Sequence, residues 1–202
     1  MFTKIKDDIR NAELKIQQGC VQEMHEILYY VAKKTQPKNY LEIGVWMGRS
    51  MALVLKASPE TQGYGIDTWA SHAGCENATP EKLKVILENL GIAKMPTFFS
   101  GSSVDILPLL WMDNKLPQLF DLILVDGDHG YETAQQDLEF CFPHLAEGGI
   151  LIFHDTTSHP WLAEIFSNFK NKLINYIFLE SCFGQGTSIA FKLPLCEEIF
   201  CR

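Results

Sequence analysis

The sequence predicts a doubly wound α/β fold, in which helices cover both faces of a mostly parallel, seven-stranded sheet. Short apolar runs alternate along the chain with segments of helical spacing. Strands that are apolar on both faces and separated by helices are typical of parallel sheets buried on both sides. The 202 residues, of which 47% are apolar, are enough to form one domain with a full core.

Seven apolar runs are the predicted strands, at residues 40–43, 64–67, 97–99, 121–126, 150–153, 176–180 and 187–191. Helices are expected between them, at residues 50–57, 79–90, 104–111 and 131–145. The last two strands are joined by residues 181–186, a link too short for a helical crossover. We therefore expect these two strands to be antiparallel, so that the sheet has an antiparallel last strand.

The first 35 or so residues carry apolar side chains at helical spacing, clearest between Met24 and Val31. This pattern predicts an N-terminal helical cap over residues 1–37, followed by the main domain at 38–193. Residues 194–202 are expected to be a C-terminal extension. The amphipathic N-terminal segment could also pack against a second copy of the chain, which leaves a homo-oligomer open.

Composition and charge indicate what kind of molecule the protein binds and where in the cell it is expected. The formal charge of −8 and the pI near 5.2 argue against a nucleic-acid-binding surface, which needs clustered Lys and Arg. The six cysteines form no Cys-x-x-Cys pair, so we expect reduced thiols, several of them in the core. The N-terminus lacks a secretory apolar run, and no stretch of about 18 apolar residues occurs. We expect a cytoplasmic protein that acts on a small molecule and binds no membrane.

The strongest local signal is a strand that ends in a glycine-bearing turn and leads into a helix, at residues 41–50. Gly44 and Gly48 allow the backbone to approach a ligand, and the helix N-terminus offers unpaired N–H groups. Asp67 ends the next strand, where a carboxylate can bind both hydroxyls of a ribose. These features predict a Rossmann-like nucleoside site, although a plain turn and helix cap remain the alternative.

Two further acidic residues follow predicted strands. Asp126 and Asp155 should converge, because the carboxyl ends of parallel strands face one crevice. Converging carboxylates suit a hard divalent cation such as Mg²⁺, but one of them could instead cap a helix or hold a cofactor. His129, three residues after Asp126, could take a proton from a hydroxyl, or could be an ordinary loop histidine. His72, His154 and His159 are secondary candidates for a catalytic histidine. His25 and His144 are expected within helices, where a catalytic role is not expected.

The chain resembles class I S-adenosylmethionine-dependent methyltransferases of the group called methyltransferase domain 24, related to catechol-type O-methyltransferases. The resemblance covers residues 38–192 and rests on the order and spacing of five motifs. These are Leu-Glu-Ile-Gly-x-x-x-Gly-x-Ser at 41–50, Gly-Ile-Asp-Thr-Trp at 65–69, Ser-Gly-Ser-Ser at 100–103, Asp-Leu-Ile-Leu-Val-Asp-Gly-Asp-His-x-Tyr at 121–131, and Leu-Ala-Glu-Gly-Gly-x-Leu-Ile-x-x-Asp at 145–155.

The resemblance implies a role for each matching residue. Those that would bind S-adenosylmethionine are Glu42, Gly44, Trp46, Gly48, Ser50, Asp67, Ser103 and Asp126. Asp67 would hold the ribose hydroxyls, and Ser103 would lie beside the adenine. The metal positions of the catechol-type relatives, two aspartates and an asparagine, match Asp126, Asp155 and Thr156. Where those relatives have a catalytic lysine, this chain has His129.

The implied function is methyl transfer from S-adenosylmethionine to a small-molecule hydroxyl, assisted by Mg²⁺ or another divalent cation. Asp126 and His129 are the expected catalytic residues, with His129 taking the hydroxyl proton. One alternative is a nicotinamide-dependent oxidoreductase, which should have a G-x-G-x-x-G turn that is not evident here. The other is a non-catalytic ligand-binding module on the same fold.

Overall fold

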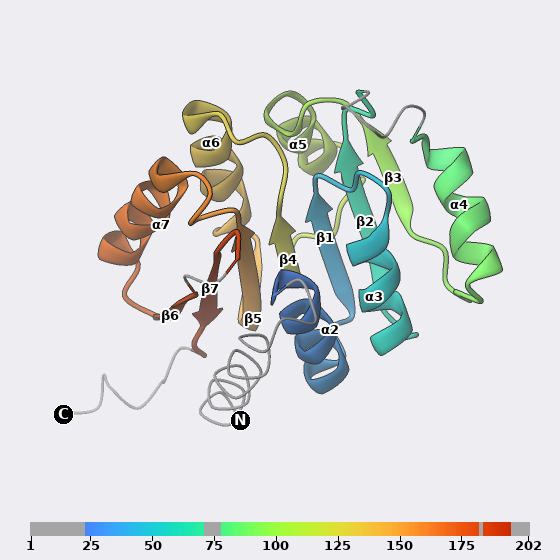
Figure 1. Cartoon of the computed structure of the whole chain (residues 1–202), viewed down its shortest axis with the longest axis horizontal. Helices are drawn as coiled ribbons and strands as arrows, with labels where there is room; N and C mark the ends of the chain where they lie inside the picture. The colour runs from blue at the N-terminus through green and yellow to red at the C-terminus, as the bar shows by residue number, and fades with distance from the viewer. Residues whose placement is uncertain (1–22, 71–77, 182–183, 195–202) are drawn as a thin grey trace.

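The computed structural model describes residues 23–70, 78–181 and 184–194, in which strands and helices alternate along the chain (Figure 1). The strands are β1 (Asn39–Ile43), β2 (Gln62–Asp67), β3 (Thr97–Ser100), β4 (Phe120–Val125), β5 (Leu145–His154), β6 (Tyr176–Ser181) and β7 (Thr187–Lys192). The helices are α2 (Glu23–Thr35), α3 (Arg49–Ala57), α4 (Pro80–Asn89), α5 (Ser103–Met112), α6 (Tyr131–Cys141) and α7 (Pro160–Lys172).

The strands form one seven-stranded sheet in the order β3-β2-β1-β4-β5-β7-β6. The first five strands pair in parallel, whereas β7 is antiparallel to both β5 and β6. The predicted doubly wound sheet with an antiparallel last strand is therefore confirmed. The strand order reverses at β1, because β2 and β3 lie on one side of it and β4 on the other.

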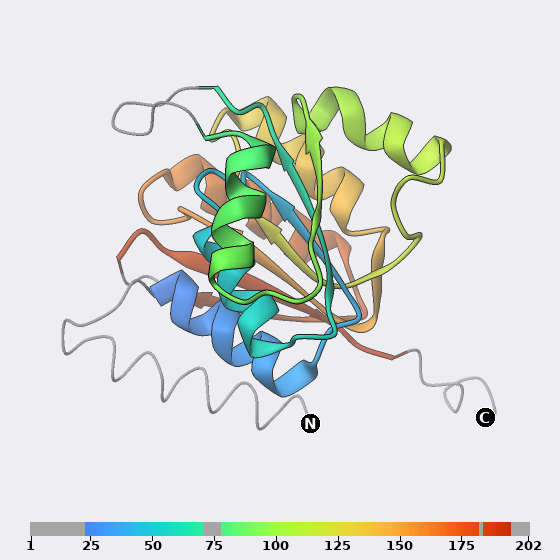
Figure 2. The ribbon, with the colours of Figure 1, turned by 90° about the vertical axis from the view of Figure 1, so that its right-hand side faces the viewer.

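Helices cover both faces of the sheet, with α2, α3 and α4 on one face and α5, α6 and α7 on the other (Figure 2). Alternate side chains of β4 divide between the two layers. Leu122 and Leu124 pack with α2 and α3, while Ile123 and Val125 pack with α5, α6 and α7. A strand buried on both faces must be apolar throughout, which explains the unbroken apolar run in the sequence.

The predicted helix over residues 131–145 is too long. Helix α6 ends at Cys141, and β5 begins at Leu145. Pro143 contributes no N–H with which to continue the helix, and His144 lies in the turn rather than in a helix as expected. Helix α7 was not among the predicted helices, although Pro160 at its start is a good helix-opening residue.

The described part of the predicted N-terminal cap is helix α2, which packs directly on the sheet. Its side chains Ile27, Leu28 and Val31 are fully buried. No helix in the described ranges is both long and apolar enough to span a bilayer. Cys141 is a buried free thiol, as expected of a core cysteine; the other cysteines and His72 lie outside the described residues.

Candidate functional site

The carboxyl ends of the central strands meet at one edge of the sheet. Gly44 follows β1, Asp67 ends β2, and Asp126 and Asp155 follow β4 and β5. In Figure 1 these strands point the same way, so the loops after them gather along the upper edge. In a doubly wound sheet the ligand crevice lies at this edge, beside the point where the strand order reverses.

The glycine turn after β1 is built against the end of β4. Gly44 has a φ of 85°, and a Cβ on it would lie 2.0 Å from the backbone oxygen of Asp126. The Gly44 N–H donates to the carbonyl of Ile66 on β2, at 2.9 Å. Only glycine fits here, because any side chain would collide with the loop that carries Asp126. Gly48, with a φ of 72°, then forms the N-cap of α3.

The Asp67 carboxylate ties the first two loops together. One of its oxygens accepts the N–H of Trp46, and the other accepts the N–H of Trp69, both at 2.7 Å. Trp46 has a φ of 48°, a left-handed backbone that non-glycine residues rarely adopt. Each carboxylate oxygen keeps lone pairs beyond these bonds, so Asp67 can still accept hydrogen bonds from a ligand.

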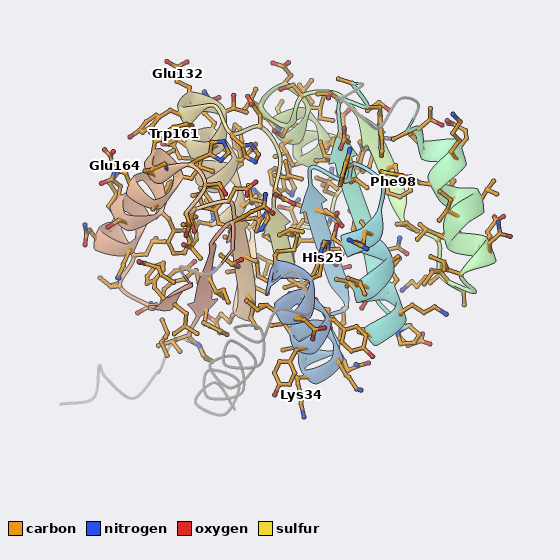
Figure 3. The ribbon with its side chains drawn as sticks, viewed as in Figure 1. His25, Lys34, Phe98, Glu132, Trp161 and Glu164 are labelled. Atoms are coloured by element: carbon orange, nitrogen blue, oxygen red, sulfur yellow. The ribbon has the colours of Figure 1, made fainter. Side chains whose placement is uncertain are left out.

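Neighbouring side chains lie close to Asp67 at this edge of the sheet. The Trp69 indole N–H donates to the Ser100 hydroxyl at 2.9 Å, and its ring packs edge-on against Phe98, which Figure 3 labels. Ser103, the predicted adenine neighbour, is buried at the first position of α5.

Glu42 lies inside the sheet below the glycine turn and is fully buried. The Tyr40 hydroxyl donates to one of its oxygens at 2.9 Å, and the Ser50 hydroxyl donates to the other. Burial raises the pKa of Glu42 to about 8, against the lowering effect of these two hydrogen bonds. Glu42 is therefore largely uncharged at neutral pH, and it anchors the first turn of α3 through Ser50.

The residues predicted to act on a substrate are brought together at the ends of β4 and β5. His154 Nδ1 lies 2.9 Å from Asp126 Oδ1 and 3.7 Å from Asp155 Oδ2. His129 Nε2 lies 2.8 Å from the same Asp155 oxygen, at ion-pair distance but without the alignment of a hydrogen bond. Asp155 has a φ of 61°, a strained backbone typical of functional sites.

The charges in this group act on one another. The contact with Asp155 raises the pKa of His129, more than partial burial lowers it. Burial by itself would raise the pKa of Asp155, but the contact with His129 and the neighbouring histidine charges lower it overall. The pair thus favours an ionised Asp155 beside a His129 that holds its proton more firmly than a free histidine.

Two aromatic side chains at the start of α7 hold the His129 loop. The ring of His159 stacks on that of His129 with centroids 4.4 Å apart, and Trp161 packs edge-on against His159. The Trp161 indole N–H donates to the His129 carbonyl at 2.7 Å. Trp161 remains 41% exposed beside the site (Figure 3).

His154 lies with two of the predicted metal ligands, Asp126 and Asp155. Asp126, His154 and Asp155 each offer a ligand atom, and these atoms lie within 4.8 Å of one another. Thr156 is buried, and its hydroxyl accepts a hydrogen bond from Ser188 on β7 at 3.3 Å. Tertiary structure thus adds His154 to the two aspartates, and a role for Thr156 as a metal ligand stays a prediction.

Some residues near the site were missed or undervalued in the sequence. His154 directly precedes Asp155 at a strand end, a position that could have indicated it. His25, on α2, has a lowered pKa, mainly because it is partly buried (Figure 3). The charges of Asp126 and His154 also act on its pKa. Asp137, buried on α6, carried no sequence signal, because a lone Asp in a helix is usually exposed.

A family model described as a methyltransferase domain matches residues 41–156, more than half of the chain. The match begins within β1 and ends just after Asp155, so it contains Asp67, Asp126, His129, His154 and Asp155 but not His159 or Trp161. The chain belongs to this methyltransferase family.

A viral protein resembles part of this methyltransferase in sequence. The uncharacterized protein R132 of Acanthamoeba polyphaga mimivirus is 24% identical over 126 residues, which are 62% of this chain and 55% of that protein. The chain thus spans little more than half the length of this relative.

Solved structures share the fold at lower identity. The O-methyltransferase TomG of Streptomyces achromogenes, involved in tomaymycin synthesis and solved with S-adenosylmethionine, is 17% identical with a TM-score of 0.64. An O-methyltransferase of Bacillus cereus, solved with S-adenosylhomocysteine, is 14% identical with the same TM-score. Each match covers 94% of this chain and 90% of the other. The methyltransferase therefore has the Rossmann-like class I fold in the residues that the structure describes.

Proposed function

We propose that this methyltransferase transfers the methyl group of S-adenosylmethionine to a hydroxyl oxygen of a small molecule. The observation that carries the proposal is the placement of two groups at one edge of the sheet: Asp67 with the glycine turn, which suits a nucleoside, and His129 with Asp155, which suits proton transfer. Structures of the same fold hold S-adenosylmethionine or S-adenosylhomocysteine, which supports this cofactor. The net charge of −8 favours a small-molecule acceptor over nucleic acid.

The cofactor would lie along the ends of β1 to β4. Asp67 would bind the ribose hydroxyls while it keeps its bonds to the N–H groups of Trp46 and Trp69. The full proposed set is Glu42, Gly44, Trp46, Gly48, Ser50, Asp67, Ser103 and Asp126. Because Glu42 is fully buried, its part would be to hold Ser50 and the first turn of α3 rather than to contact solvent-facing atoms.

His129 would take the acceptor's proton as the methyl group is transferred. Asp155 contacts Nε2 of the ring, which leaves Nδ1 as the ring atom able to accept a proton. Only the neutral imidazole is a base, so the raised pKa of His129 favours turnover above neutral pH. Much of the rate would come from aligning the acceptor oxygen with the methyl group.

A divalent cation would fit between Asp126 and Asp155, the positions proposed from the resemblance together with Thr156. Carboxylate oxygens suit Mg²⁺, while the nearby imidazole of His154 also suits Mn²⁺ or Zn²⁺. When bound, such a cation lowers the pKa of an acceptor hydroxyl.

The cytoplasmic location and the association with a second copy of the chain, both expected from the sequence, are proposals as well.

Calorimetry of S-adenosylmethionine binding, with Mg²⁺ and with EDTA, tests the proposal. The wild-type protein should bind, and Asp67→Ala should lose binding by at least tenfold in Kd. Asp121→Ala is a matched control, because Asp121 also accepts two backbone N–H groups, from Lys38 and Asn39, but at the other end of the sheet. The control should bind as the wild type does.

Each outcome decides one part of the proposal. Binding that weakens in EDTA would support a cation next to the cofactor, whereas binding indifferent to EDTA would leave His129 to act alone. Failure of folded wild-type protein to bind S-adenosylmethionine would reject the proposed function.

A further inference from the structure

Helix α6 carries one acidic side chain on its buried face. Ala134, Leu138 and Cys141 lie on this face at helical spacing, and Asp137 lies among them with no exposed surface. Within the part of the chain that the structure describes, neither Asp137 oxygen has a hydrogen-bond partner of normal geometry. A buried carboxyl without partners destabilises a fold, so its presence calls for another reason.

Two segments of the proposed cofactor site face this carboxyl. A Cβ added to Gly127, in the loop after β4, would lie 3.8 Å from Asp137 Oδ2. Ser103, at the start of α5, is near enough for its hydroxyl to favour the charged form of Asp137. Asp137 therefore lies below the loop that carries Asp126 and beside the first turn of α5.

The surroundings of Asp137 bring the pKa of its carboxyl near neutral pH. Burial raises the pKa of Asp137 to about 7, Ser103 opposes this rise, and the negative charge of Asp128 adds to it. The groups that face Asp137 are Asp128 from the β4–α6 loop, Cys141 from α6 itself and the uncharged Ser103 from α5.

We propose that Asp137 is a positioning residue for cofactor binding: its carboxylate gains hydrogen bonds from Ser103 and the Gly127 loop when an adenine binds beside them. This inference rests on the proposed function, because it takes S-adenosylmethionine as the ligand. In the structure the Ser103 hydroxyl lies near the carboxyl but makes no hydrogen bond of normal geometry with it. In the complex the two segments close onto it, and the ionised form is favoured.

The test compares S-adenosylmethionine binding and thermal unfolding for Asp137→Leu, Asp137→Asn and the control Leu138→Ala. Asp137→Leu should raise the Tm, since it removes a buried unpaired acid, and yet weaken S-adenosylmethionine binding about tenfold or more. Leu138→Ala should lower the Tm, since it opens a cavity in the same helix face, and leave Kd near the wild-type value.

A pH series separates positioning from a purely structural role. Wild-type Kd should tighten relative to Asp137→Asn as pH rises from 6 to 8, because binding would favour the ionised carboxylate. Equal Kd values for all three Asp137 forms, or parallel pH profiles for wild type and Asp137→Asn, would overturn the inference while leaving the proposed function intact. If Asp137→Leu does not fold, the Asp137→Asn profile alone decides. Wild-type protein that binds no S-adenosylmethionine rejects both proposals together.

Discussion

Three buried carboxyl groups of this protein differ in their hydrogen-bond partners and therefore in their pKa values. Glu42, Asp137 and Asp155 are all nearly or fully buried, but they are stabilised in different ways. Two hydroxyls donate to Glu42, histidines surround Asp155, and Asp137 has no partner of normal geometry among the described residues. The pKa values of Glu42 and Asp137 therefore rise, whereas that of Asp155 falls.

The first prediction concerns stability and pH at Glu42. The folded-state pKa of about 8 lies above the ordinary value of 4.5, so the folded protein holds a proton that the unfolded chain has lost between these values. Wild-type stability should thus fall as pH rises from about 4.5 to 8, by roughly 1 kcal/mol per pH unit for a group shifted in this way. Glu42→Gln has no carboxyl to ionise at this position, so its stability should not fall with pH for this reason. In urea unfolding, the variant should match wild type near pH 5 and exceed it at pH 8.

Glu139→Gln is the matched control, because Glu139 is an exposed glutamate on α6. Its stability difference from wild type should not change with pH. If Glu42→Gln shows the same flat difference, Glu42 is ionised in the folded protein and its proposed burial as a neutral group is wrong.

At the scale of elements, helix ends position the site. Gly48 opens α3, Ser103 opens α5, and His159 precedes α7, so three helices begin at or near the strand ends that carry the candidate site. Helix N-termini present unpaired N–H groups, which favour negatively charged or hydrogen-bond-accepting ligands. The sequence indicated α3, α4 and α5 as helical stretches between the apolar runs, but α7 was missed, since its Thr-Thr-Ser-His-Pro opening resembles an ordinary loop.

The second prediction tests one such cap. The Thr79 hydroxyl accepts the N–H of Lys82 at the start of α4, with Pro80 in the first turn. Thr79→Ala should lower the free energy of unfolding by about 1 kcal/mol. Ser102→Ala is the comparison, because Ser102 is the N-cap of α5 but makes no capping bond through its side chain. Chemical unfolding should show the smaller loss for Ser102→Ala; an equal loss would mean that the Thr79 bond contributes nothing.

In the whole molecule, the candidate site draws on the loops after β1, β2, β4 and β5. A ligand there contacts the ends of several strands, so binding should stabilise the folded state as a unit. The third prediction is that S-adenosylhomocysteine at 100 times its Kd raises stability by about 2.7 kcal/mol. For a domain of this size that corresponds to a Tm increase of roughly 5 to 10 °C, which differential scanning fluorimetry would detect.

NADH at the same concentration separates the rival function. Both ligands carry an adenosine, but an oxidoreductase would be stabilised more by the dinucleotide. A larger Tm increase with NADH than with S-adenosylhomocysteine would favour the nicotinamide-dependent alternative over methyl transfer.

Local sequence pattern was enough to place the strands, most of the helices and the edge at which the site residues meet. Apolar runs marked all seven strands, because strands buried on both faces must be apolar. Gly44, Asp67, Asp126 and Asp155 could be placed at one edge, because parallel strands end on the same side of a sheet. Those inferences need only local pattern and one topological rule.

Which side chains meet within that edge depends on tertiary packing. It set His154 between Asp126 and Asp155, turned the Thr156 hydroxyl toward Ser188, and buried Glu42 and Asp137 in the core. These outcomes depend on side-chain direction and on contacts between strands and helices far apart in the chain. Local periodicity carries no information about such contacts, because each is the result of how whole layers pack.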